Sequence, residues 1–116
     1  ALDAIQHFGN EGAEMDVPLG NSVAVSANGI DLVLISTRTQ TLSPEVFTNV
    51  GIDPLSKKIL VVKSIQHFYA RFAPIAAKVI YMAAPGTCLP DFKAIPYQIA
   101  SYNRWPMTED PLGASS

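Results

Sequence analysis

The side chains with the most chemistry in this sequence lie at Lys63-Ser64 and His67, directly after the apolar run 59–62. A serine after such a run often caps a helix, and the free N–H groups at a helix start attract anions. Lys63 would add a full cation to this corner, and His67 an imidazole. The pattern predicts a site that binds an anion. The alternative is a structural cap, with Lys63 in solvent and His67 packed on the core.

Arg38 and Gln40 form a second polar group, in the segment Thr-Arg-Thr-Gln-Thr that follows another apolar run. Such side chains line the mouth of a pocket, or they satisfy the backbone of a loop. With Lys63, Ser64 and His67 they form our set of candidate binding residues.

The groups that a complete hydrolase needs are missing. A zinc hydrolase uses three protein ligands and a general base, whereas His7 and His67 are the only histidines and no His-Glu-x-x-His pattern occurs. The carboxylates near His7 are more typical of a solvated polar face. Ser64 lies in no Gly-x-Ser-x-Gly turn, and Cys88 has no cationic neighbour to activate it. We therefore predict no catalytic residue and no metal ligand in this chain.

The sequence predicts that an α/β fold with a mixed sheet positions these groups. Two apolar runs flank Asn28-Gly29, which predicts an antiparallel hairpin at about 21–36. A serine, a proline and a later glycine predict a short helix over 43–51. Residues 59–82 read as strand, helix and strand, with the second short helix from Ser64 to about residue 73 and a parallel pairing of the two strands.

The two ends have weaker patterns. Residues 1–20 predict a short helix or turn and an irregular segment, and we expect 1–16 and 107–116 to be loosely ordered parts of one domain that spans 1–116. The tetrapeptide Ile-Gln-His-Phe occurs at 5–8 and again at 65–68, but the flanking residues differ. We interpret this recurrence as coincidence rather than as a repeat architecture.

Composition excludes some classes of function. The chain has 116 residues, 48% hydrophobic and 16% charged, with a net charge of −2, so it offers no basic field for nucleic acid. It has no apolar run that would cross a membrane, and its one cysteine fits a reducing compartment, so we expect a cytoplasmic protein. So few charges predict an apolar surface that meets a partner or supports a homo-oligomer. A start at Ala1 also suggests a processed chain or a fragment.

Several segments in order resemble the C-terminal domain of the MlrC-like zinc metallopeptidases. The resemblance covers roughly residues 17–106, and its most specific segments are Arg38-Thr-Gln40-Thr and Lys63-Ser64-x-Gln-His67-Phe. The other matching segments are Gly29-Ile-Asp-Leu-Val-Leu, Ser43-Pro-Glu-Val-Phe, Gly51-Ile-Asp-Pro54, Phe72-Ala-Pro74, Ala84-Pro-Gly86, Pro96-Tyr97 and Trp105-Pro106.

The resemblance implies a function for the whole protein more than for this chain. It implies a zinc-dependent peptidase or amidohydrolase whose zinc ligands sit in an N-terminal catalytic domain, in the same chain or a companion chain. This chain would bind no zinc and would be inactive alone. Its substrate-binding residues would be Lys63, Ser64, His67, Arg38 and Gln40, which would face the cleft between the domains and bind a carboxylate or carbonyl of a peptide or amide substrate. The alternative is a non-catalytic interaction or scaffold domain.

Overall fold

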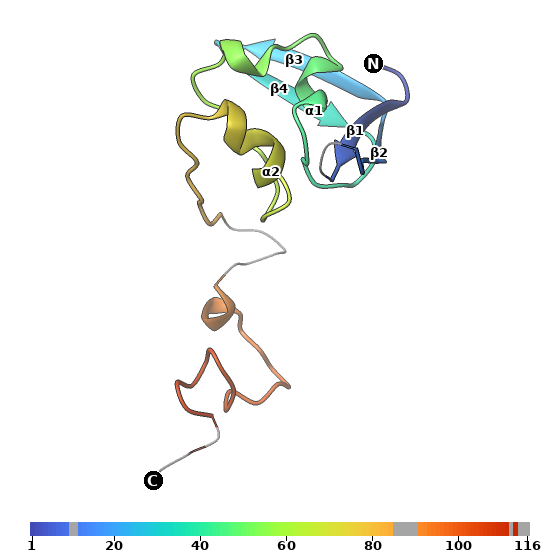
Figure 1. Ribbon diagram of the computed structural model, residues 1–116. Coiled ribbons are helices and arrows are strands. Elements are labelled where there is room, and N and C mark those ends of the chain that lie inside the picture. The colour runs from blue at the N-terminus through green and yellow to red at the C-terminus, as the bar shows by residue number, and fades with distance from the viewer. Residues whose placement is uncertain (10–11, 85–90, 112, 114–116) are drawn as a thin grey trace. The chain divides into compact units, whose positions relative to one another are not determined.

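The computed structural model describes residues 1–9, 12–84, 91–111 and 113 (Figure 1). These residues form two compact units, Ala1–Val79 and Ile80–Ser116. The first unit contains two separate antiparallel sheets of two strands each, β1-β2 and β3-β4. The single domain over 1–116 stays a prediction. Within the described residues, no helix combines the length and the apolar character needed to span a bilayer.

The second sheet is the hairpin that the sequence predicts at about 21–36. Strand β3 (Ser22–Ala27) pairs with β4 (Ile30–Ile35), and Ala27 lies opposite Ile30 at the turn. Asn28 and Gly29 take φ values of 51° and 77°, so both turn residues are left-handed. A tight turn of this kind matches the twist of the strands, which is why the Asn-Gly pair specifies the hairpin.

The first sheet corrects the interpretation of residues 1–20. Strand β1 (Ala4–Phe8) pairs antiparallel with β2 (Met15–Gly20), where a helix or turn and a loosely ordered segment were predicted. The alternation along β1 is inverted, because Gln6 is buried and Ile5 is exposed. Pro18 also weakens the strand pattern of β2, although proline is tolerated in a strand at the edge of a sheet.

The two hairpins join at Gly20, the last residue of β2. Its φ is +66°, and an added Cβ would collide with the hydroxyl of Ser36. Beside it, Thr37 donates its N–H to the Leu19 carbonyl (3.0 Å) and Ser36 donates its N–H to the Asn21 carbonyl (3.0 Å). The backbone angle therefore favours glycine, and the hydroxyls of Ser36 and Thr37, which follow β4, leave little room for a side chain.

The helices are short. In the first unit they are α1 (Glu45–Thr48), η1 (Pro54–Ser56), α2 (Tyr69–Phe72) and η2 (Ala73–Ile75), and the second unit has η3 (Phe92–Ala94). Helix α1 confirms the helix predicted over 43–51. The mixed α/β class is also confirmed, by two sheets and several short helices.

The predicted strand-helix-strand unit at about 59–82 is a correction. Residues 59–62 and 78–82 have no strand assignment, and α2 begins only at Tyr69. Exposure alternates along 59–62, with Ile59 and Val61 outside, so the segment has the pattern of a strand. A strand also needs a neighbour for its N–H and C=O groups, and among the described residues no second strand pairs with it.

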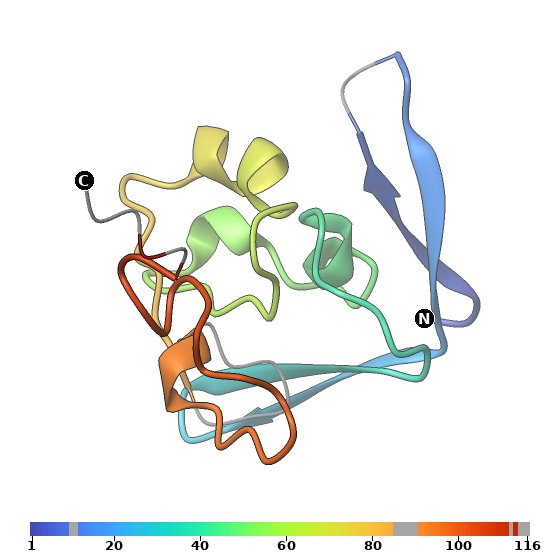
Figure 2. The same cartoon turned by 90° about the horizontal axis from the view of Figure 1, so that it is seen from below.

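The core of the first unit lies between the sheets and α1. Ala4, Leu19 and Val46 are buried together, and Val33 and Ile35 of β4 pack against them. Figures 1 and 2 show α1 on one side of the β3–β4 hairpin. The opposite face of this hairpin is aliphatic and exposed, and it carries Val23, Val25, Ile30, Leu32 and Leu34. We call these five residues the aliphatic face.

Candidate functional site

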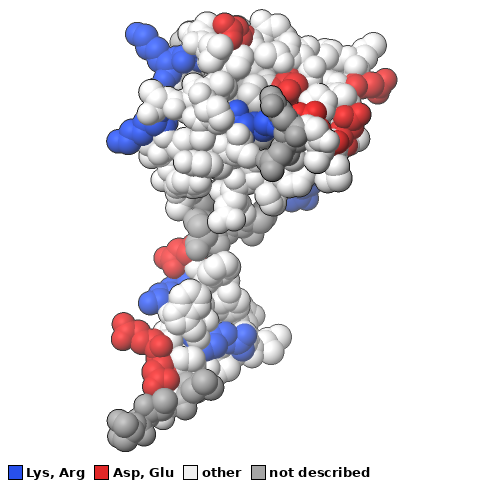
Figure 3. All heavy atoms as spheres, viewed as in Figure 1, with Lys and Arg blue, Asp and Glu red and all other residues white. Residues whose placement is uncertain are grey.

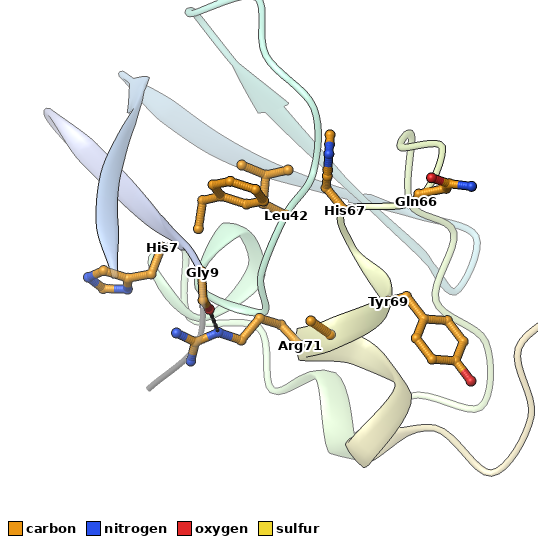
Figure 4. A pocket seen from close by; sticks show the side chains of 9 residues that line it. His7, Gly9, Leu42, Gln66, His67, Tyr69 and Arg71 are labelled. Carbon is orange, nitrogen blue, oxygen red and sulfur yellow. Dashed lines mark hydrogen bonds between the residues drawn. The ribbon is translucent and has the colours of Figure 1, made fainter. Parts of the chain in front are cut away.

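An open pocket of about 470 Å³ lies between β1 and the segment that leads into α2 (Figure 4). We call it the β1–α2 pocket. Its lining residues are His7, Phe8, Gly9, Leu42, Gln66, His67, Tyr69, Ala70 and Arg71. Two imidazoles, one guanidinium and several apolar groups therefore surround one space.

The two copies of Ile-Gln-His-Phe meet at this pocket. His7 and Phe8 of the first copy and Gln66 and His67 of the second all line it. The rings of Phe8 and His67 are perpendicular, at 79°, with centroids 5.2 Å apart. The two copies do not share a secondary structure, so the recurrence is no repeat, although residues of both copies line one pocket.

Arg71 closes one end of the pocket. Its Nε donates a hydrogen bond to the Gly9 carbonyl (3.2 Å), and its Nη2 forms an ion pair with Glu14. Figure 4 shows the guanidinium reaching from α2 to Gly9, while the side chains of His67 and Tyr69 point in different directions. The cation therefore fixes the β1–β2 hairpin to α2, and its charge is already compensated by Glu14.

Gln6 positions the loop that forms the floor of the pocket. The side chain is fully buried, at 0% exposure, and its Nε2 donates to the Gln40 carbonyl (2.7 Å). Its Oε1 accepts the Leu42 N–H (2.8 Å). One step further, the His7 N–H donates to Ser43 Oγ (3.0 Å). A buried amide that pairs with both backbone groups of a loop holds that loop in one conformation.

The structure brings three of the five predicted binding residues together. Ser64 Oγ donates to Gln40 Oε1 (2.9 Å), and the Lys63 carbonyl accepts the Thr41 N–H (3.2 Å). These bonds join the segment around Gln40 to the segment around Ser64. The Lys63 side chain is exposed.

His67 and Arg38 have different positions. His67 is exposed and lines the β1–α2 pocket three residues after Ser64. Arg38 is exposed on the segment from β4 to Gln40. The structure does not place Ser64 at the start of a helix, where an anion site was expected, because Ser64 precedes α2 by five residues and does not cap it. Only the proximity of the residues remains as support for a binding role.

His7 lies between two carboxylates. Its Nδ1 is 3.4 Å from Glu45 Oε1, and its Nε2 is 3.5 Å from Asp16 Oδ1. Burial raises the pKa of Glu45, but hydrogen bonds from Ser43, from its own backbone and from His7 outweigh burial and hold the pKa below its ordinary value. Glu45 Oε2 is buried with no hydrogen-bond partner among the described residues.

This cluster does not fit a zinc ion. The carboxylates contact opposite nitrogens of one imidazole, so the donors do not converge. Across the described ranges, no group of three His, Cys, Asp or Glu side chains is placed to hold a metal ion. Ser43 is fully buried and accepts the His7 N–H, so it cannot reach a substrate as a nucleophile.

Comparison with known proteins gives the class of this chain. The family model described as MlrC C-terminus matches residues 3–98, and the chain belongs to this family. Among curated proteins, it is similar to Microcystinase C of Sphingomonas sp., with 33% identity over 67 residues, which are 58% of this chain and 13% of that protein. The chain thus spans a small part of the curated relative that it matches. No solved structure matches.

Proposed function

We propose that this chain is the substrate-binding module of an MlrC-like zinc-dependent peptidase or amidohydrolase. The hydrolase would hold its zinc in an N-terminal catalytic domain, in the same chain or a companion chain, since the residues described here do not fit the metal. The chain alone would be inactive, and the whole protein would be cytoplasmic. The natural partner would be a peptide or amide small molecule.

The proposal is supported by the contact between the segments around Gln40 and Ser64, within a chain of the MlrC family. This contact brings polar groups from two loops to one region next to the β1–α2 pocket. Lys63 and Arg38 would pair with a carboxylate of the substrate, because both side chains are cationic. Gln40, Ser64 and His67 would hydrogen-bond to its amide or carbonyl groups.

The test is Lys63→Met in the complete hydrolase, assayed with a peptide substrate. We expect kcat/KM to fall about tenfold or more, since a charge-assisted hydrogen bond is lost, with little change in the free energy of unfolding. Lys58→Met is the matched control, because it removes an exposed lysine from the same stretch of chain. Unchanged kinetics in Lys63→Met would remove Lys63 from the site.

A second candidate function is a non-catalytic interaction domain, favoured by the aliphatic face. Monomeric proteins rarely expose large contiguous apolar patches, and such patches mark sites that bind another protein. Under the first proposal the catalytic domain covers this face, and under the second a further copy of this chain covers it. Sedimentation of the purified chain and the length of the parent reading frame separate the two. A monomer with an upstream segment that carries His and Asp ligands supports the first proposal.

A further inference from the structure

The second unit has a pocket of its own, of about 300 Å³. We call it the Trp105 pocket. Its lining residues are Phe92, Tyr97, Ala100, Ser101, Arg104, Trp105, Pro106 and Met107. The volume is at the lower end of the range for small-molecule sites, roughly 300–1,000 Å³. None of the residues proposed above to bind substrate contributes to it.

The wall of this pocket is unusually aromatic for a surface. Phe92, Tyr97 and Trp105 are all exposed, and Trp105 keeps 73% of its surface in contact with solvent. Aromatic side chains contribute most to the free energy of binding when a ligand buries them, and they prefer edge-to-face or offset contacts with other rings. The wall therefore fits a flat apolar group, such as an aromatic ring.

Arg104 gives the pocket a cation that has no carboxylate partner among the residues that the structure describes. Its Nε donates to the Ser101 carbonyl (2.7 Å), which orients the guanidinium. In the part of the second unit that the structure describes, Asp91 accepts the Lys93 N–H and Asp110 accepts the Gly113 N–H. No salt bridge of the described residues includes Arg104. A fixed guanidinium at the edge of an apolar wall recognises a carboxylate.

The loop that carries these groups is held by its own hydrogen bonds. Tyr102 donates its hydroxyl to the Tyr97 carbonyl (3.1 Å), and its own carbonyl accepts the Thr108 hydroxyl (3.0 Å). The Thr108 N–H also donates to the Arg104 carbonyl (3.0 Å). The aromatic wall and the cation are thus set at a fixed spacing within one loop, which limits the entropy lost on binding.

We infer that the Trp105 pocket binds an aromatic group that carries a carboxylate, such as the C-terminal aromatic residue of a peptide. The ring contacts Trp105 and Tyr97, and the carboxylate pairs with Arg104. This inference depends only on residues of the second unit, so it stands or falls separately from the function proposed for Lys63.

The chain provides its own probe, because Trp105 is its only tryptophan. The full chain is titrated with N-acetylphenylalanine, with N-acetylphenylalanine amide and with N-acetylglycine, and the fluorescence of Trp105 is recorded. We expect a blue shift with the first ligand, about tenfold weaker binding of the amide because the charge-assisted bond is lost, and the weakest binding for the ligand without a ring. Equal responses to the acid and the amide, or no response to any ligand, would overturn the inference.

Variants separate a specific site from general charge attraction. Arg104→Gln should remove the preference for the acid over the amide, and Arg104→Lys should keep part of it. Lys93→Gln removes the same charge from the same unit without altering the pocket lining. If Lys93→Gln lost the preference as fully as Arg104→Gln, the attraction would be nonspecific and the inference wrong. An unchanged emission spectrum of each unliganded variant checks that the loop keeps its fold.

Discussion

The two hairpins of the first unit are held in place in different ways. The β1–β2 hairpin is attached to the rest of the unit by hydrogen bonds from residues far along the chain. Besides the bonds of Gln6, the Ile5 carbonyl accepts Asn49 Nδ2 (2.6 Å) and the Gly9 carbonyl accepts Arg71 Nε (3.2 Å). The β3–β4 hairpin has a regular ladder of its own and packs only one face on the core.

The β1–β2 hairpin therefore has a structural role, whereas the β3–β4 hairpin has one apolar face that remains exposed among the described residues. In β1–β2, the polar side chain of Gln6 faces inward beside the apolar Ala4 and Leu19, and its amide has both partners on the 40–42 loop. In β3–β4, apolar groups face both ways, and one set of them stays in solvent. An exposed aliphatic face contributes little to the stability of the isolated chain, so we expect it to serve an interaction.

The largest expected effect is that of Leu19→Ala, at the buried end of β2. Leu19 is fully buried, with 0% exposure, between the two hairpins. Its truncation leaves a cavity and should lower the free energy of unfolding by about 3 kcal/mol. Urea denaturation followed by circular dichroism measures the change.

Leu32→Ala on the aliphatic face is the matched control. This leucine is 55% exposed, so the same truncation should cost less than about 1 kcal/mol. Equal losses from the two variants would contradict the comparison. They would mean that the aliphatic face is covered in the purified chain, by a second copy.

The sequence predicts the second hairpin better than the first for the same physical reason. Asn28-Gly29 between two apolar runs is a local signal, and the pairing that it favours needs no distant residue. The first hairpin depends on Gln6, a polar residue that is buried only because the 40–42 loop supplies its partners. No local pattern of residues reveals such a long-range hydrogen bond. Residues 1–20 were therefore wrongly predicted to form a short helix or turn and an irregular segment.

Gln6→Met should have the next largest effect. Methionine fills a similar volume but cannot pair with the Gln40 carbonyl or the Leu42 N–H, so the buried Leu42 N–H loses its acceptor. We expect a loss of about 2 kcal/mol in the free energy of unfolding. Hydrogen exchange of the Leu42 amide should also become faster, because its acceptor is gone.

Gln66→Met, in the second copy of Ile-Gln-His-Phe, is the control for this change. Gln66 is exposed, so the same substitution should alter the free energy of unfolding by less than about 0.5 kcal/mol. A loss as large as that of Gln6→Met would show that burial of the amide is not the cause.

The sequence predicts only part of the candidate site. The proximity of Gln40 and Ser64 was expected from two polar segments, and the structure joins them by a hydrogen bond. The roles of His7 and Arg71 were missed, because their partners lie on other elements. The expected helix start at Ser64 fails because Ser64 and the backbone next to it bond to the segment around Gln40 instead.

The smallest expected effect is a change in how the free energy of unfolding depends on pH. Two carboxyl groups with lowered pKa values report on the hairpins, one that contacts β1 and one that lies on β4. The pKa of Glu45, beside β1, lies below its ordinary value of 4.5, because hydrogen bonds from Ser43, its backbone and His7 outweigh burial. The pKa of Asp31, on β4, is lowered mainly by hydrogen bonds from Lys57 and Ser26. A carboxyl with a lowered pKa stabilises the fold above its unfolded pKa, and this contribution is lost as the pH falls through the folded value.

Denaturation at a series of pH values between about 6 and 3 therefore distinguishes the hairpins. Glu45→Gln should remove one acid-dependent contribution, which we expect to stay below about 1 kcal/mol because the group is partly exposed and screened by water. Asp31→Asn should remove a separate contribution, that of the carboxyl on β4. If Glu45→Gln kept the full pH dependence of the wild type, the contact between His7 and Glu45 would not help to hold the first hairpin.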